Sequence, residues 1–152
     1  MENYLGSNLK LGESEVTTSE LKNKGMVLLY FSASWSYPCR RFTSILKEFY
    51  EKVNKVDREI EIVFISCDLN EEQFNEYYGT MPWYALPFEE QGIKDIVTRH
   101  YEVSGIPQLI LVNECGGVVS DSCRLDIMSK DSSDCILYWR DKIQSRSSIM
   151  ML

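Results

Sequence analysis

The feature that most constrains the fold is a pair of strand-like segments separated by a stretch with helical periodicity. Residues 26–31 form a continuous apolar run, and residues 60–65 are apolar except for Glu61. Both segments are rich in β-branched and aromatic side chains, as in strands buried on both faces. Between them, apolar side chains recur at steps of three and four residues from Phe42 to Val53, which predicts a helix. Pro38 fits the first turn of this helix, where its missing N–H is harmless. The three pieces predict a β-α-β unit with parallel strands, and therefore an α/β fold.

The middle of the chain adds two helices and a third strand to this unit. Asn70 is suited to cap a helix over residues 70–78, and Gly79 is suited to end it. Residues 89–102 have the pattern of another helix. Residues 108–112 read as a strand that follows directly on an Ile-Pro pair. The order of elements predicts helices on the faces of one sheet.

The remaining segments have weaker patterns. Residues 1–25 mix glycines with short alternating stretches, which predicts an irregular arm or a small hairpin. Residues 116–119 predict a hairpin into a fourth strand, so that the sheet finishes mixed. Residues 121–132 are polar and carry no clear pattern, and residues 136–143 predict a final amphipathic helix. We expect the end of the chain, residues 145–152, to fray.

The charge balance narrows the classes of partner. The chain carries 16 Lys and Arg against 23 Asp and Glu, a net charge of -7, which opposes attraction to nucleic acid and to anionic lipid. The longest apolar run, residues 26–31, is far shorter than the ~20 residues of a membrane span, and no basic segment with an apolar core precedes it. We expect no nucleic-acid partner, no membrane insertion and no secretion. Because no linker or repeat interrupts the chain, we expect one domain over residues 1–152.

The cysteines are spaced too widely for a structural metal site. They stand at positions 39, 67, 115, 123 and 135, and His100 is the single histidine of the chain. Zinc sites use Cys and His ligands in close pairs, so we expect no metal. An odd set of cysteines, in a chain without an Asn-x-Ser/Thr acceptor, fits a reducing compartment better than a secreted disulfide scaffold. We therefore expect a cytoplasmic or nuclear protein.

The most informative motif joins the first buried strand to the following helix. It reads Trp35-Ser36-Tyr37-Pro38-Cys39. Two further motifs follow in order, Met-Pro-Trp-Tyr-Ala-Leu-Pro-Phe over residues 81–88 and Ile106-Pro107 before the third strand. Together they resemble the motifs of tryparedoxins and nucleoredoxins in the thioredoxin-like superfamily, where Trp is followed by Cys, two residues ending in Pro, and another Cys. The resemblance covers about residues 8–142.

This resemblance implies a thioredoxin fold, with a central mixed sheet flanked by helices and an N-terminal arm or hairpin, and a redox site at the helix start. A thiol there meets the partial positive charge of unpaired backbone N–H groups, which stabilises the thiolate that attacks a substrate disulfide. A second thiol three residues later attacks the mixed disulfide and releases the product. Cys39 matches that second, resolving position. The substrate-binding residues that the resemblance implies are Trp35, Tyr37, Pro38, Trp83, Ile106 and Pro107.

Two of these assignments carry structural expectations. Ile106-Pro107 corresponds to a loop with a cis proline, in which the backbone of the preceding residue pairs with an extended substrate segment. We therefore expect a cis peptide at this bond. Trp35 corresponds to a residue beside the active site that contacts the partner. Trp83 belongs to the surroundings of the site in the family, and a core aromatic is an equally fair interpretation of it.

Ser36 stands where the family has its attacking Cys. A hydroxyl neither ionises near neutral pH nor forms a disulfide, so the two-thiol cycle cannot run with Ser36 in place. Two explanations remain open. Ser36 is either a substitution introduced to suppress reactivity, or the mark of a natural, degenerate member of the family that uses Cys39 alone or no redox chemistry.

Two functions follow from these motifs. The first is an enzyme, a thiol-disulfide oxidoreductase that needs no organic cofactor and is inactive, impaired or limited to monothiol chemistry in its Ser36 form. In the family, electrons pass from a low-molecular-weight dithiol or a reductase to disulfides of client proteins. The alternative is a non-catalytic module that recognises extended peptide segments in the same groove.

Overall fold

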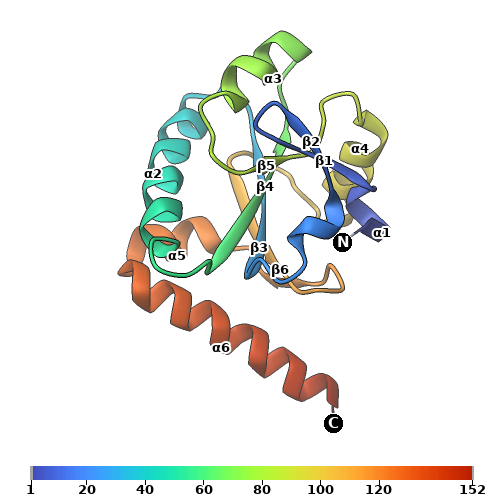
Figure 1. Cartoon of the computed structure of the whole chain (residues 1–152). Helices are drawn as coiled ribbons and strands as arrows, with labels where there is room; N and C mark the ends of the chain where they lie inside the picture. The colour runs from blue at the N-terminus through green and yellow to red at the C-terminus, as the bar shows by residue number, and fades with distance from the viewer. Residues whose placement is uncertain (1, 152) are drawn as a thin grey trace.

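One mixed sheet organises the chain in the computed structural model, which describes residues 2–151 (Figure 1). The strands follow the order β2-β1-β5-β4-β3-β6-β7 across the sheet. Their bounds are Asn8–Leu11 for β1, Ser14–Thr17 for β2, Met26–Ser32 for β3, Ile60–Ser66 for β4, Tyr84–Ala85 for β5, Gln108–Val112 for β6 and Val118–Ser120 for β7. Strands β3, β4 and β5 are parallel, and all other neighbours are antiparallel. The predicted mixed sheet is confirmed.

Helices cover both faces of this sheet. Their bounds are Glu2–Leu5 for α1, Thr18–Leu21 for the 3₁₀ helix η1, Tyr37–Val53 for α2, Glu71–Tyr78 for α3, Gln91–His100 for α4, Cys123–Ser129 for α5 and Ser132–Met151 for α6. Figure 1 shows α2 on one side of the sheet and α1 and α4 on the other. The flanking helices predicted for a thioredoxin fold are therefore present.

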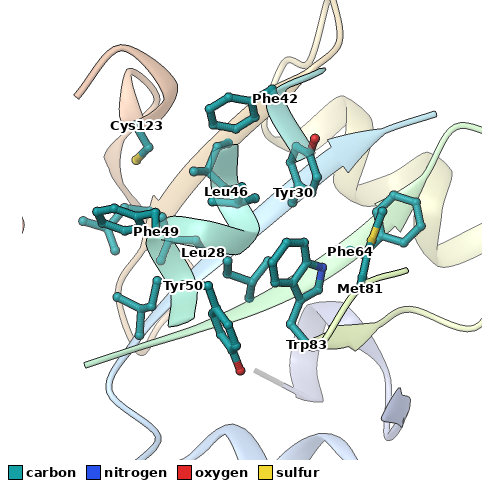
Figure 2. Packing of buried hydrophobic residues seen from close by; sticks show 14 of the residues in the cluster. Leu28, Tyr30, Phe42, Leu46, Phe49, Tyr50, Phe64, Met81, Trp83 and Cys123 are labelled. Carbon is teal, nitrogen blue, oxygen red and sulfur yellow. The ribbon is translucent and has the colours of Figure 1, made fainter. Parts of the chain in front are cut away.

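Alternating side chains of the central strand β3 hold the two layers together. Leu28 and Tyr30 point into the core with α2, α3, α5 and α6, part of which is drawn in Figure 2. Leu29 and Phe31 point into the other core, with α1 and α4. Because both faces are covered, the strand is apolar from Met26 to Phe31, which explains the uninterrupted run that marks it in the sequence.

The β3-α2-β4 unit forms as the sequence predicts. Strands β3 and β4 pair in parallel, with Tyr30 opposite Phe64. Helix α3 also has its predicted ends, since the Asn70 side chain accepts a hydrogen bond from the Gln73 N–H at 2.9 Å and Gly79 closes the helix. The capping oxygen satisfies one of the N–H groups that the first helical turn leaves free.

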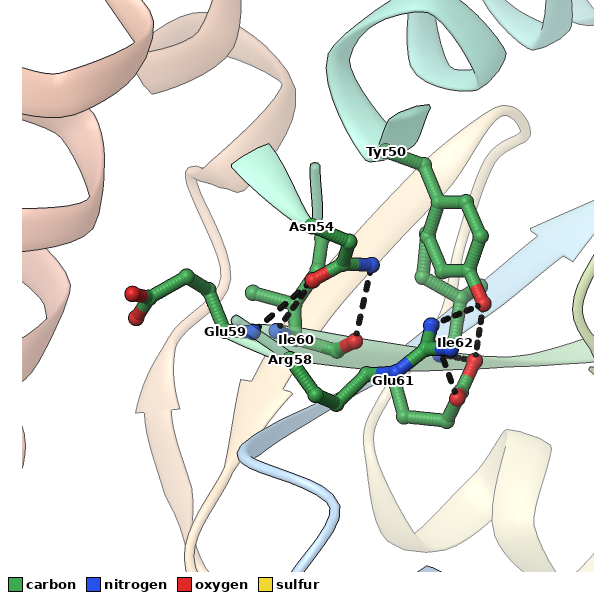
Figure 3. A network of polar contacts seen from close by, with 7 residues as sticks. All are labelled: Tyr50, Asn54, Arg58, Glu59, Ile60, Glu61 and Ile62. Carbon is green, nitrogen blue, oxygen red and sulfur yellow. Dashed lines mark hydrogen bonds and ion pairs between the residues drawn. The ribbon is translucent and has the colours of Figure 1, made fainter. Parts of the chain in front are cut away.

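A polar network fastens the start of β4 to the C-terminal end of α2 (Figure 3). The Asn54 Oδ1 atom accepts hydrogen bonds from the N–H groups of Glu59 and Ile60, at 2.8 and 3.1 Å. The buried Glu61 carboxylate accepts a hydrogen bond from the Tyr50 hydroxyl at 2.7 Å and lies 3.5 Å from Arg58. These contacts fix how α2 lies on the sheet, and therefore where its first turn sits.

The N-terminal hairpin is more than an arm, because it extends the central sheet. Strand β1 pairs with β2 and also with β5, where Leu11 lies opposite Tyr84. Strand β5 has only two residues, and proline follows it closely at Pro87. Such a short strand carries no detectable alternation, so the sequence does not predict it.

The C-terminal part differs most from the expectation. Residues 121–132, for which the sequence gives no clear pattern, contain α5, and its Asp126 carboxylate accepts a hydrogen bond from the Trp139 indole at 3.0 Å. This tertiary contact orders a segment whose own pattern is weak. Helix α6 continues to Met151, through most of the segment from residue 145 for which the sequence predicts a frayed end.

Candidate functional site

The loop between β3 and α2 carries the candidate site. Ser36 is the N-cap residue of α2, with an extended backbone, and its hydroxyl accepts a hydrogen bond from the Cys39 N–H at 3.4 Å. Pro38 lies in the first turn, as predicted. Residue 36 therefore lies at the positive end of the helix, next to N–H groups that have no partner within it. This is where the resemblance requires an attacking thiol.

Cys39 lies in the first turn of α2 and is fully buried. Its carbonyl oxygen accepts hydrogen bonds from the Thr43 hydroxyl at 2.9 Å and the Tyr30 hydroxyl at 3.3 Å. A buried thiol cannot reach a large substrate, but it can attack a sulfur attached to residue 36, which is three residues before it. The geometry therefore suits the second step of a two-thiol cycle better than the first.

Four buried hydroxyl groups form a chain below this turn. The Tyr30 hydroxyl lies 2.7 Å from that of Thr43, which lies 2.6 Å from that of Tyr77, which in turn lies 2.8 Å from that of Ser32. Burial raises the pKa values of Tyr30 and Tyr77, so both phenols stay neutral. The sequence analysis missed this chain. Its only signal is the presence of polar residues at inward-facing positions of an apolar strand and helix.

Two aromatic side chains flank Ser36 on the surface. Trp35 is 54% exposed and Tyr37 is 64% exposed, which is unusual for side chains of this size. The Trp35 indole donates a hydrogen bond to the Cys67 carbonyl at 3.1 Å, and the Arg40 guanidinium lies over the Tyr37 ring at 5.7 Å. The two rings are thus oriented without being covered, as a surface that contacts a partner would require.

A buried carboxylate contacts the same loop, and the sequence analysis did not identify it. One oxygen of Asp68 accepts hydrogen bonds from the N–H and the hydroxyl of Ser34, both at 2.7 Å. The other accepts from the Ser66 hydroxyl at 2.8 Å. Asp68 comes shortly after β4 ends, and a carboxylate at the carboxyl end of a parallel strand is the signal that could have found it.

The Ile106-Pro107 peptide bond is cis, as predicted. It precedes β6, and the Pro107 carbonyl accepts a hydrogen bond from the Arg124 guanidinium of α5 at 3.3 Å. Ile106 is partly exposed and Pro107 is buried. The carboxyl end of β3 and the amino end of β6 meet at one edge of the sheet, because these strands are antiparallel neighbours with Phe31 opposite Gln108.

Trp83 does not lie where the resemblance places a substrate-binding residue. Its side chain is fully buried, and its ring packs against those of Tyr50 and Tyr30, with centroids 5.4 and 6.2 Å apart (Figure 2). The predicted direct contact with a substrate is therefore wrong in this conformation, because the indole is enclosed by the aromatic core. Trp83 reaches the site only through Tyr30, and the alternative prediction of a core aromatic holds.

The other cysteines fall outside the motif. Cys67 is half-buried after β4, and burial raises the pKa of its thiol, partly offset by the positive charge of Lys94. Cys115 is exposed, while burial raises the pKa values of Cys123 and Cys135 to about 12. The thiols of the described residues are all free. Over residues 2–151, no group of His, Cys, Asp and Glu could hold a metal ion, and no helix is long and apolar enough to cross a membrane.

Comparison with known proteins agrees with this geometry. A family model described as thioredoxin-like matches residues 23–118, which contain the loop, α2 and the cis proline. The chain is 42% identical to tryparedoxin of Trypanosoma brucei brucei over 123 residues, which cover 80% of this chain and 84% of the relative. The chain belongs to the thioredoxin-like family, in the branch of the tryparedoxins and nucleoredoxins.

Two other members of the branch define the extent of the likeness. A nucleoredoxin of Danio rerio is 37% identical over 124 residues, which cover 82% of this chain but only 29% of the nucleoredoxin. A solved structure of tryparedoxin II complexed with glutathionylspermidine superposes with a TM-score of 0.76 at 33% identity, covering 82% of this chain and 86% of that one. The chain thus corresponds to most of a tryparedoxin and to less than a third of a nucleoredoxin.

Proposed function

We propose that this thioredoxin-like protein is a thiol-disulfide oxidoreductase of tryparedoxin and nucleoredoxin type whose attacking position is occupied by Ser36. The observation that carries the proposal is the relation between Ser36 and Cys39. The side chain of residue 36 lies against the free N–H groups of α2, 3.4 Å from the Cys39 N–H, and Cys39 is buried one turn further on. The free N–H groups of α2 at residue 36 would favour a thiolate there, which supports the assignment of the attacking position to this residue.

With Cys at position 36, the site would run a two-step exchange. The thiolate of residue 36 would attack one sulfur of a client disulfide, form a mixed disulfide and release the first client thiol. The Cys39 thiolate would then attack the residue 36 sulfur, release the second client thiol and leave a disulfide between residues 36 and 39. A low-molecular-weight dithiol or a reductase would return both residues to thiols. With Ser36, only the buried Cys39 remains, so the protein is inactive or limited to monothiol chemistry.

The residues around the loop would bind the client. Trp35 and Tyr37 offer exposed rings next to residue 36. The Ile106 backbone, beside the cis proline, would pair with an extended client segment. Pro38 would hold the first turn of α2. Trp83 would act only as support for Tyr30.

The partners and the setting follow from the same assignment. The tryparedoxin II complexed with glutathionylspermidine supports a small thiol compound as the electron donor. We propose client protein disulfides as acceptors and no nucleic-acid or membrane partner, in keeping with a net charge of -7. We further propose that residues 1–152 act as one domain, in the cytoplasm or the nucleus.

A second function is favoured by Ser36 itself. Because a Ser hydroxyl cannot exchange with a disulfide, the loop with its exposed Trp35 and Tyr37 would serve as a module that binds extended peptide segments without electron transfer. The coding sequence bears on this choice. A natural Ser codon at position 36 supports the binding module, and a natural Cys codon supports the enzyme.

The deciding experiment compares the Ser36 protein with a Ser36→Cys variant in the reduction of insulin by a dithiol, followed by turbidity. We expect only the Ser36→Cys variant to accelerate the reaction. A Ser36→Cys, Cys39→Ser double variant is the matched control, which should trap a mixed disulfide but turn over poorly. If neither Ser36→Cys nor the Ser36 protein accelerates the reduction of insulin or of other protein disulfides, the oxidoreductase proposal fails.

A further inference from the structure

Two side chains of opposite charge, Asp68 and Arg40, hold the loop that carries residue 36 by hydrogen bonds to Ser34. The Asp68 carboxylate accepts hydrogen bonds from both the N–H and the hydroxyl of Ser34, at 2.7 Å each. The Arg40 guanidinium donates a hydrogen bond to the Ser34 carbonyl at 2.6 Å. Every polar group of Ser34 therefore has a charged partner. Hydrogen bonds to charged groups are the stronger kind, so Ser34 is a fixed point in the loop.

The Asp68 carboxylate is itself rigidly placed. Asp68 is 5% exposed, and its second oxygen accepts a hydrogen bond from the Ser66 hydroxyl at 2.8 Å. The same hydroxyl accepts a hydrogen bond from the Asp68 N–H at 3.0 Å. Ser66 is the last residue of β4 and lies opposite Ser32 of β3. The position of the carboxylate is thus set by the central sheet.

The segment of residues 66–68 holds the end of β3 and the loop between β3 and α2 at more than one place. Besides the bonds from Asp68 to Ser34, the Cys67 N–H donates to the Ser32 carbonyl at 2.8 Å. The Cys67 carbonyl accepts from the Trp35 indole at 3.1 Å. The direction of Trp35 and of the next residue, Ser36, therefore depends on how this segment is anchored.

We propose that Asp68 is a positioning residue, which fixes Ser34 and thereby sets the place of Trp35 and of the nucleophile at residue 36. The proposal rests on the proposed oxidoreductase function and extends it to a residue outside the motif. Asp68 does not touch the substrate or the reacting sulfur. It acts through its hydrogen bonds to Ser34, and Arg40 of α2 holds the same residue by a hydrogen bond to its carbonyl.

The same arrangement has an electrostatic consequence. Asp68 brings a negative charge to a residue only two positions before residue 36, where the amino end of α2 favours an anion. A nearby like charge disfavours a thiolate. Replacing Asp68 by Asn keeps an oxygen that can accept from Ser34 but removes the charge, whereas Ala removes both. The two variants therefore separate the charge from the hydrogen bonds.

The test uses the Ser36→Cys protein as the parent and adds Asp68→Asn, Asp68→Ala or the control Asp57→Asn, which changes an exposed carboxylate in the α2–β4 turn. The pKa of the thiol introduced at position 36 is measured from its alkylation rate against pH, read on the peptide that contains it by mass spectrometry. We expect Asp68→Asn to lower that pKa by roughly half a unit to one unit, and Asp57→Asn to leave it unchanged. We expect Asp68→Ala to lower kcat/KM for insulin on the order of tenfold.

The thiol measurement does not need reductase activity, so the two proposals can fail separately. If the parent reduces no disulfide but Asp68→Ala changes the thiol pKa by a different amount from Asp68→Asn, the positioning inference stands and the proposed function falls. If Asp68→Ala does not fold, Ser34→Ala replaces it and is compared with the parent, because it removes the hydroxyl that donates to Asp68 and keeps the charge. The inference is overturned if the variant that lacks the hydrogen bonds matches its partner that keeps them, Asp68→Asn or the parent, in both the thiol pKa and kcat/KM.

Discussion

Replacing Tyr77 by Phe tests whether the buried hydroxyl chain below the first turn of α2 stabilises the fold. The substitution removes one oxygen and keeps the ring, which packs edge-on against Phe64 with the centroids 5.6 Å apart. That oxygen lies 2.6 Å from the Thr43 hydroxyl and 2.8 Å from the Ser32 hydroxyl. Thr43 still donates to the Cys39 carbonyl in the variant, whereas Ser32 loses its contact with Tyr77.

The expected cost follows from these contacts. A net hydrogen bond contributes about 0.5–1.5 kcal/mol, and two are lost, so we expect the free energy of unfolding to fall by about 1–3 kcal/mol. For a domain of this size, each kcal/mol lowers Tm by about 2–4 °C. Adding Ser32→Ala removes the hydroxyl that Tyr77→Phe leaves behind. The double variant should therefore be less destabilised than the sum of the two single variants.

The assay is urea unfolding followed by circular dichroism and by tryptophan fluorescence, with equal m-values required of all variants. Tyr138→Phe is the matched control, because its half-exposed hydroxyl makes no hydrogen bond among the described residues. It should change the free energy of unfolding by less than about 0.5 kcal/mol. If Tyr77→Phe costs no more than this control, or if Ser32→Ala and Tyr77→Phe are simply additive, the hydroxyls do not act as a stabilising chain.

Three further outcomes concern groups that are buried or held in an unusual backbone conformation. Burial raises the pKa of Glu61, so the stability linked to its protonated form is present below the ordinary carboxyl pKa and lost as the pH rises through the raised value. Glu61→Gln should therefore gain stability relative to the parent between acidic and neutral pH, measured by urea unfolding across that range. Gly25 has a φ of +90°, and a Cβ there would clash with the Glu59 carbonyl oxygen, so Gly25→Ala should lower the free energy of unfolding by more than about 1 kcal/mol, measured by thermal unfolding. Alkylation of the native protein should modify the exposed Cys115 first and leave the buried Cys123 protected, and equal rates at both would contradict the burial described.

The sequence predicts those helices and strands whose formation depends mainly on neighbouring residues. The apolar run of β3, the apolar stripe of α2 and the Asn70 cap of α3 are each recognisable within a short segment of the sequence. Strand β5 and helix α5 are not, because the first is only a partner for β1 and β4, and the second is held by Asp126 against Trp139 of α6. Their order depends on contacts between segments far apart in the sequence, which periodicity does not report.

The candidate site likewise contains residues that the sequence motif identifies and residues that only contacts between distant segments bring to it. The motif located residue 36, Cys39 and the cis proline, because these follow one another in a recognisable order. It did not locate Asp68, which follows β4 and accepts hydrogen bonds from Ser34 of the loop. Nor did it locate Tyr77 of α3, whose hydroxyl lies within hydrogen-bond distance of Thr43 in α2. It left two interpretations of Trp83 open, a residue that binds the substrate and a core aromatic, because no pattern distinguishes a ring that lines a site from one that is buried beneath it, and the structure favours the second.

The structure also explains why the loop keeps its form without the attacking thiol. Ser is among the preferred N-cap residues, and its hydroxyl is a better acceptor for the Cys39 N–H than a thiol would be. The contacts that fix the loop, from Asp68 and Arg40 to Ser34 and from Trp35 to Cys67, involve no atom of the residue 36 side chain. Stability at position 36 thus favours the hydroxyl and redox chemistry requires the sulfur. A scaffold whose geometry does not depend on that side chain can hold either residue, and the Ser36 protein therefore keeps the contacts that fix the loop.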